Sequence, residues 1–207
     1  TVEYQTGSSA TETKLITINT KDITPYRVNV SGSTYLIYPL PLELVNSEAI
    51  QETFYQKLTI RGESADGATG QADDVIDGKT FYFNPHFAKV VENTDTVPEN
   101  PTRIAIRTVR QLYHLSLYYD YYVECTKESS YNQELNIDYT TSYDWEKFAG
   151  VPKVTAQSPI GIRDGKITAF AATYNGGYHE IRGISFETSA QKVGFIGENN
   201  GIVQNVF

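Results

Sequence analysis

The sequence of 207 residues contains no methionine. A chain that starts at its own translation start begins with methionine, so we expect this one to be processed from a longer precursor. A signal peptide or a lipid-anchor segment would then belong to that precursor. The lack of such a segment here therefore excludes no cellular compartment.

The sequence has one cysteine, Cys125. A disulfide needs two, so intramolecular disulfides are excluded, and burial and hydrogen bonding must hold the fold. Cys125 lies in a β-prone run at residues 121–126, which predicts a buried, inert thiol. The alternative, a nucleophilic thiolate, needs a nearby histidine, and none lies in the adjacent sequence.

Long apolar runs are missing too, and basic residues are outnumbered. No stretch approaches the ~18–20 apolar residues that a membrane-spanning helix needs. The 17 Lys and Arg against 25 Asp and Glu give a formal net charge of −8, which disfavours polyphosphates and anionic lipids. The counts argue against nucleic acid as a partner and against membrane insertion of this segment. No Gly-rich phosphate loop occurs, and no cofactor is predicted.

Two domains are expected from the pattern of apolar residues, after a flexible lead-in at residues 1–13 that is rich in Thr, Ser and Glu. Short β-branched and aromatic runs separated by turn residues predict an antiparallel β-sandwich over residues 14–97. These runs are residues 15–19, 27–30, 34–38, 54–60 and 79–83. Gly32 and the pair Asp77-Gly78 are predicted to form hairpin turns.

A polar segment with two prolines, residues 93–101, is the predicted domain boundary, and the second domain covers residues 98–207. Residues 103–106 read as a strand. Thr108 then fits a helix N-cap, with Gln111 completing a capping box. Apolar residues at spacings of three and four predict one short helix over residues 109–119.

The C-terminal tail contains an internal repeat. Residues 181–184 align with residues 203–206, an offset of 22 residues that fits one coil of a parallel β-helix. Glycine and asparagine would form the corners with positive φ. The turn glycines predicted from this pattern are Gly176, Gly194, Gly197 and Gly201.

The segment GFIGENNGIVQNV, residues 194–206, resembles the GLUG-type repeat of surface proteins from Bacteroides-like bacteria. TYNGGYHEIRGISF, residues 173–186, is similar to the segment that precedes it in that family. Upstream, IRTVRQLYHLS at residues 106–116, the pair Ile137-Asp138, Trp145 and residues 159–161 follow the family's order. Asn175 and Tyr178 depart from the family pattern, which usually has Asp and a second Gly at these positions.

The resemblance implies a fimbrillin-associated cell-adhesion protein: exported, displayed at the cell surface or outer membrane, and lipid-anchored in its precursor. Its partners would be a host or bacterial surface protein or glycan, or other pilus subunits. The expected fold is mainly β, with the N-terminal sandwich followed by a small right-handed parallel β-helix that one short helix caps. No enzymatic activity is expected.

Two classes of polar site are weighed against simpler interpretations. Asp66, Asp73, Asp74 and Asp77 carry the hard oxygen ligands that calcium prefers, but their spacing does not fit a calcium loop, and a solvated hairpin loop explains them. His86, His114 and His179 are too far apart for a local zinc pattern. No metal site is predicted.

A carbohydrate-active β-helix enzyme, a polysaccharide lyase or glycoside hydrolase, is the alternative function. It would need two carboxylates about 5–10 Å apart. The candidates are Asp138, Asp144, Glu146, Asp164, Glu180 and Glu198. None of their spacings matches the 22-residue period.

Tyrosine is abundant, with 16 residues, and many of them crowd residues 113–145. Tyr and Trp offer a flat apolar face and a polar tip, which suits a sugar or protein interface. The ligand-contact candidates are Tyr118, Tyr119, Tyr122, Tyr143 and Trp145. The alternative is that these rings pack against the helix and the first coil.

Overall fold

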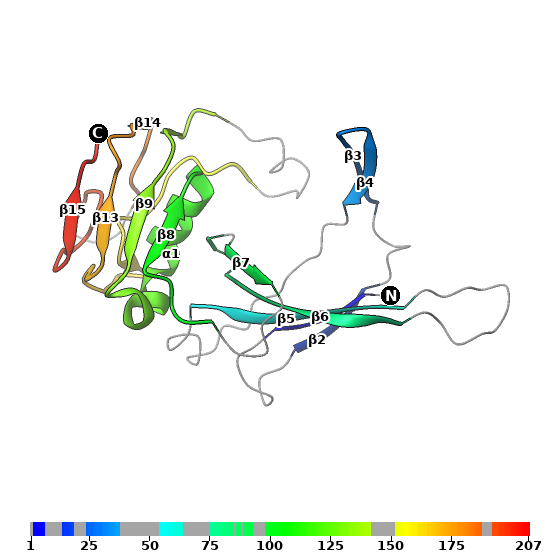
Figure 1. Ribbon diagram of the computed structural model, residues 1–207. Coiled ribbons are helices and arrows are strands. Elements are labelled where there is room, and N and C mark those ends of the chain that lie inside the picture. The colour runs from blue at the N-terminus through cyan, green and yellow to red at the C-terminus, as the bar shows by residue number, and fades with distance from the viewer. Residues whose placement is uncertain are drawn as a thin grey trace, which may run out of the picture. The chain divides into compact units, whose positions relative to one another are not determined.

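The computed structural model describes residues 2–6, 14–18, 24–37, 54–63, 75–84, 86–87, 89–92, 98–141, 152–187 and 192–207. These residues form mainly strands, in antiparallel and parallel sheets, with one α-helix among them (Figure 1). The chain divides into two compact units. The first comprises Thr1–Ser47, Tyr55–Phe83 and Val90–Pro98, and the second Glu48–Phe54, Asn84–Lys89 and Glu99–Phe207.

A five-stranded sheet of order β2-β1-β5-β6-β7 dominates the N-terminal half. Its strands are β1 (Val2–Thr6), β2 (Lys14–Ile18), β5 (Gln56–Glu63), β6 (Val75–Asn84) and β7 (Lys89–Glu92). β1 pairs antiparallel with β2 and β5, and β5 pairs antiparallel with β6. The strands β2, β5 and β6 overlap the runs predicted from the sequence.

A separate hairpin joins β3 (Tyr26–Val30) to β4 (Ser33–Ile37). Its two turn residues, Ser31 and Gly32, both have positive φ, at 50° and 83°. Positive φ at both central positions matches the turn to the right-handed twist of the strands, so the predicted hairpin turn is confirmed.

Two local predictions in this half are wrong. Val2–Thr6, placed in the flexible lead-in, forms β1, which lies between β2 and β5, because backbone hydrogen bonds to both neighbouring strands outweigh its polar composition. Asp77 and Gly78 lie within β6 instead of forming a turn. The register shifts there, since Ile60 pairs with Lys79 but Gly62 pairs with Ile76. Asp77 and Gly78 therefore form an irregularity within the strand. Asp66, Asp73 and Asp74 lie outside the described residues.

The second unit is built on a four-stranded sheet of order β15-β13-β9-β8 (Figure 1). Its strands are β8 (Arg103–Ile106), β9 (Ser130–Gln133), β13 (Thr173–Asn175) and β15 (Ile202–Gln204). All three pairings are parallel. Two short strands, β10 (Ile137–Asp138) and β14 (Ile181–Arg182), add another parallel pair, and β11 (Ile162–Arg163) forms a hairpin with β12 (Lys166–Ile167).

The predicted 22-residue repeat is wrong in its register. Val203 pairs with Tyr174, 29 residues earlier, whereas Ile181 pairs with Ile137. Isolated parallel bridges at Gln157–Phe186 and Phe170–Asn199 share the 29-residue spacing. A match of apolar residues at two positions of a four-residue segment is too short to decide which segments stack.

Close approach of backbones explains two of the four predicted glycines. A Cβ on Gly176 would lie 2.3 Å from the carbonyl oxygen of Asn205, and one on Gly201 would lie 2.0 Å from that of Ala172. A Cβ on Gly197 would meet the Ile162 side chain at 2.4 Å, and Gly194 has a φ of 158°. At Gly176 and Gly201, therefore, space between neighbouring segments and not a positive-φ corner requires glycine.

The helix α1 (Val109–Thr126) is longer than predicted. Thr108 is its N-cap as expected, and the Thr108 hydroxyl accepts from the backbone N–H of Gln111 at 3.2 Å. The Gln111 side chain reaches back to accept from the N–H of Arg107, a close variant of the predicted capping box. The residues predicted to be β-prone, 121–126, form its last turns because they bury Tyr122 and Cys125 there.

An aromatic core joins the helix to the sheet within the second unit. Leu112, Leu115 and Tyr119 are fully buried on one face of α1. The ring of Tyr119 lies 6.5 Å from that of Tyr131 on β9 and 5.0 Å from that of Phe170. Burial raises the pKa of the Cys125 thiol to about 12, so the predicted buried cysteine is confirmed.

Replacing Gly201 by alanine should destabilise the second unit by about 1–3 kcal/mol or more, since its Cβ would overlap a backbone carbonyl that cannot rotate away. Urea unfolding followed by circular dichroism measures the loss. Asn200→Ala, at the exposed neighbouring position, is the matched control and should change stability by less than about 0.5 kcal/mol. Equal stability of the two variants would show that the segments at Gly201 and Ala172 are not packed this closely.

Candidate functional site

Two of the predicted ligand-contact tyrosines are not accessible. Tyr119 and Tyr122 are 0% and 1% exposed, on the helix stripe that also carries Leu112 and Leu115. In each of the adjacent pairs Tyr118-Tyr119 and Tyr121-Tyr122, the helix turns one ring inward and leaves the other half-buried. The prediction that Tyr119 and Tyr122 contact a ligand is therefore corrected.

The outer members of these pairs are half-buried. Tyr118 stacks on Tyr121 with ring centroids 6.0 Å apart, and the guanidinium of Arg163 lies 4.2 Å from the centre of the Tyr121 ring. Arg163 also pairs with Asp120. Tyr143 and Trp145 lie outside the described residues.

His86, His114, Tyr118 and Tyr122 form a cluster that the sequence did not predict. The His86 ring is buried, stacks on Tyr118 at 3.9 Å between centroids, and lies 5.1 Å from the ring of His114. Its Nδ1 is 2.7 Å from the hydroxyl of Tyr122. His86 and His114 are far apart in the sequence and form no local zinc pattern, but their rings meet in the fold where the segment before β7 packs on α1.

Asn84 fixes the segment that carries His86. Its side-chain oxygen accepts from the backbone N–H of His86 at 2.9 Å and of Phe87 at 3.2 Å, and its amide donates to the carbonyl of Phe54 at 2.7 Å. All of these groups are buried, so the turn is held without help from solvent.

Burial keeps the cluster uncharged. It lowers the pKa of His86 to about 3, with a further contribution from neighbouring His114, and it also lowers the pKa of His114. Burial raises the pKa of Tyr122 well above its usual range, so its phenol stays protonated beside the neutral imidazole. In the part of the chain that the structure describes, no three His, Cys, Asp or Glu residues are grouped to hold a metal ion.

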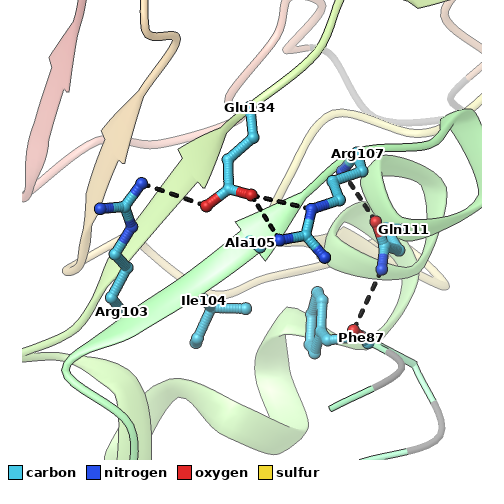
Figure 2. A pocket seen from close by; sticks show the side chains of 7 residues that line it. All are labelled: Phe87, Arg103, Ile104, Ala105, Arg107, Gln111 and Glu134. Atoms are coloured by element: carbon cyan, nitrogen blue, oxygen red, sulfur yellow. Dashed lines mark hydrogen bonds and ion pairs between the residues drawn. The ribbon is translucent and has the colours of Figure 1, made fainter.

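A pocket of about 290 Å³ lies along β8, the last strand of its sheet. Figure 2 shows its polar side, where Glu134 reaches between two arginines. Glu134 is 3.1 Å from Arg103 and 2.7 Å from Arg107. The other lining residues are Phe87, Ile104, Ala105 and Gln111.

The pocket has an excess of positive charge that faces water. Two guanidiniums share one carboxylate, and the arginine side chains are 66% and 59% exposed whereas Glu134 is 25% exposed. The Gln111 amide donates to the carbonyl of Phe87 at 3.0 Å, which joins the start of α1 to the apolar side of the pocket. Such a site favours an anion.

A second exposed surface surrounds the edge strand β15. Tyr178, Val193, Ile202 and Phe207 are between 57% and 72% exposed, and the rings of Tyr178 and Phe207 lie 5.8 Å apart. Tyr178 has a φ of 63°, a left-handed conformation that costs an L-residue about 1–2 kcal/mol.

Three of the carboxylates considered for catalysis have partners among the described residues. Asp138 accepts from the backbone and hydroxyl of Thr140, which lowers its pKa. Glu180 pairs with Arg182, and Glu198 pairs with Lys192 at 2.7 Å. Asp164 sits in the turn between β11 and β12 with a φ of 51°. Asp144 and Glu146 lie outside the described residues.

Comparison with known proteins found no matching family model, no similar curated protein and no similar solved structure. The one helix described is not long and apolar enough to cross a membrane.

Acid should destabilise the protein through His86. Its pKa is lowered from 6.5 to about 3 on folding, so between these values the unfolded chain binds a proton that the folded chain does not. The free energy of unfolding therefore holds its full value above the pKa of 6.5 in the unfolded chain and decreases below it, by roughly 2 kcal/mol at about pH 5.

Urea unfolding at several pH values measures this slope. His86→Gln should make the dependence shallower without abolishing it, because His114 also has a lowered pKa. His179→Gln, at a half-buried histidine outside the cluster, should retain the full dependence. A slope that survives His86→Gln unchanged would refute the assignment to His86.

Proposed function

We propose that this chain is a cell-surface adhesion or pilus-associated binding module that recognises a protein or glycan and has no catalytic role. We further propose that its N-terminal half is an antiparallel sandwich and its C-terminal half a small right-handed parallel β-helix of GLUG-like coils. In this proposal the protein is exported and lipid-anchored through its precursor. Its partners are a host or bacterial surface molecule or other pilus subunits.

The stacking of the C-terminal segments supports the β-helix part of the proposal. β13 and β14 lie in the segment that resembles the first half of the GLUG-type pattern, and β15 lies in the segment that resembles the second half. β13 is parallel to β15 and to β9, as successive coils of a β-helix would be. The glycines at 176 and 201 stand where neighbouring backbones come closest.

The observation that carries a binding function is the pocket on β8. Exposed guanidiniums are usually mobile, but Arg103 and Arg107 are both tied to Glu134 on a sheet held by parallel pairing. Side chains whose positions are fixed before binding lose less entropy when a ligand arrives. A rigid scaffold with a charged pocket suits recognition. We propose this pocket, in place of the buried tyrosines, as the favoured contact surface.

An array of glycans and matrix proteins tests the proposal. The chain should bind at least one member, and Arg103→Ala/Arg107→Ala should weaken that binding by about tenfold or more, since hydrogen bonds to charged groups contribute about 1.5–3 kcal/mol. Arg182→Ala, at an equally exposed arginine paired with Glu180 outside the pocket, is the control and should bind as the parent does. No binding to any member, or equal binding by the pocket variant, would contradict the proposal.

A further inference from the structure

We propose that the pocket on β8 binds a single acidic sugar residue of the uronate type, a pyranose ring that carries one carboxylate. This inference rests on the proposed function and specifies the ligand class of the same site. The pocket holds about 290 Å³, at the lower end of the range for small-molecule sites and larger than one acidic side chain needs.

The carboxylate would be held by guanidinium donors that Glu134 leaves unused. Arg103 donates to one Glu134 oxygen through a single terminal nitrogen, and Arg107 donates to the other through Nε and a terminal nitrogen. A guanidinium has five N–H donors in a planar fork, so each arginine retains donors for a second carboxylate. Within the described residues, no other partner is found for them.

Among the described residues no strand pairs with the outer edge of β8, and this edge offers groups for sugar hydroxyls. The carbonyls of Thr102 and Ile106 accept from Ser130 and Glu134, on the side that faces β9. Alternate residues of a parallel strand bond to alternate sides, so the backbone N–H and C=O of Ala105 face away from β9. Ala105 lies between the two arginines and lines the pocket (Figure 2).

The overall charge favours one isolated acid over a polyanion. The formal net charge of the chain is −8, so a densely charged polymer would be repelled by most of the surface. The two arginines and Glu134 together carry one positive charge, enough for a single carboxylate. At its other side the pocket is bounded by Ile104 and Phe87, whose side chains are buried.

An NMR titration of the full chain with sodium glucuronate, with glucose as the uncharged probe, tests the inference. Glucuronate should bind and shift the resonances of residues 103–107, glucose should bind at least about tenfold more weakly, and added salt should weaken glucuronate binding. Equal binding of glucose and glucuronate would overturn the proposal. So would binding of N-acetylglutamate amide at least as tight as that of glucuronate, because the pocket would then recognise an acidic side chain.

The Glu134→Gln variant distinguishes an anion-binding site from an ion pair that only stabilises the fold. Glutamine keeps one carbonyl oxygen to position the two guanidiniums but removes the competing negative charge, so glucuronate should bind about two- to fivefold more tightly, the range expected for losing a competing surface pair. Arg103→Lys/Arg107→Lys keeps the charge but loses the planar fork, and should bind more weakly than the parent. Arg182→Ala should leave binding unchanged, and matching circular dichroism spectra establish that each variant is folded.

Weaker glucuronate binding in a folded Glu134→Gln variant would overturn the inference, because Glu134 would then be an acceptor for the ligand. Failure of the acidic-sugar inference can be told apart from failure of the proposed binding function. A neutral glycan or a protein that binds the array and is lost on Arg103→Ala/Arg107→Ala would sustain the binding function while refuting the acidic sugar. An array without any binder, by contrast, would refute the binding function.

Discussion

The in-register parallel pairing of short segments is the constraint on which the second unit depends. β9, β13 and β15 stack with Tyr131 beside Tyr174 and Tyr174 beside Val203. Three-residue strands bring few hydrogen bonds each, so the segments between them must also approach closely. The Ile202 N–H donates to the Ala172 carbonyl at 3.1 Å, which shows how close the backbones lie. A side chain at Gly201 would remove the space that this contact requires.

The same stacking decides which tyrosines are buried. Tyr131 and Tyr174 face inward at successive levels and are both fully buried, and α1 closes the core with Tyr119. Each hydroxyl has a partner. Tyr131 donates to the Thr126 hydroxyl at 3.0 Å, and Tyr174 donates to the Gln133 side chain at 3.2 Å. The Tyr119 hydroxyl accepts from the backbone N–H of Ala171 at 2.8 Å. These three tyrosines therefore belong to the core, and their hydroxyls are hydrogen-bonded within the protein.

Local features of this fold could be predicted from the sequence, and features that depend on distant partners could not. Residues 103–106 and the Thr108 cap were found because their signals lie within a few residues. The end of α1 was missed because Tyr122 and Cys125 gain burial that overrides the β-propensity of their neighbours. The pairing of Ile181 with Ile137, and the contact of His86 with His114, carry no local signal, since each joins segments far apart in the chain.

The charged pocket is a consequence of the parallel register. Residues 103, 105 and 107 alternate with the buried Ile104 and Ile106, so both arginines and the small Ala105 lie on the outer face of β8. Ile106 pairs with Gln133, which places Glu134 one position beyond, level with Arg107. Because Ala105 is small, Arg103 can reach across it to the same carboxylate. A shift of one residue between β8 and β9 would turn Glu134 to the other face and separate the three charges, so the scaffold and its site depend on one register.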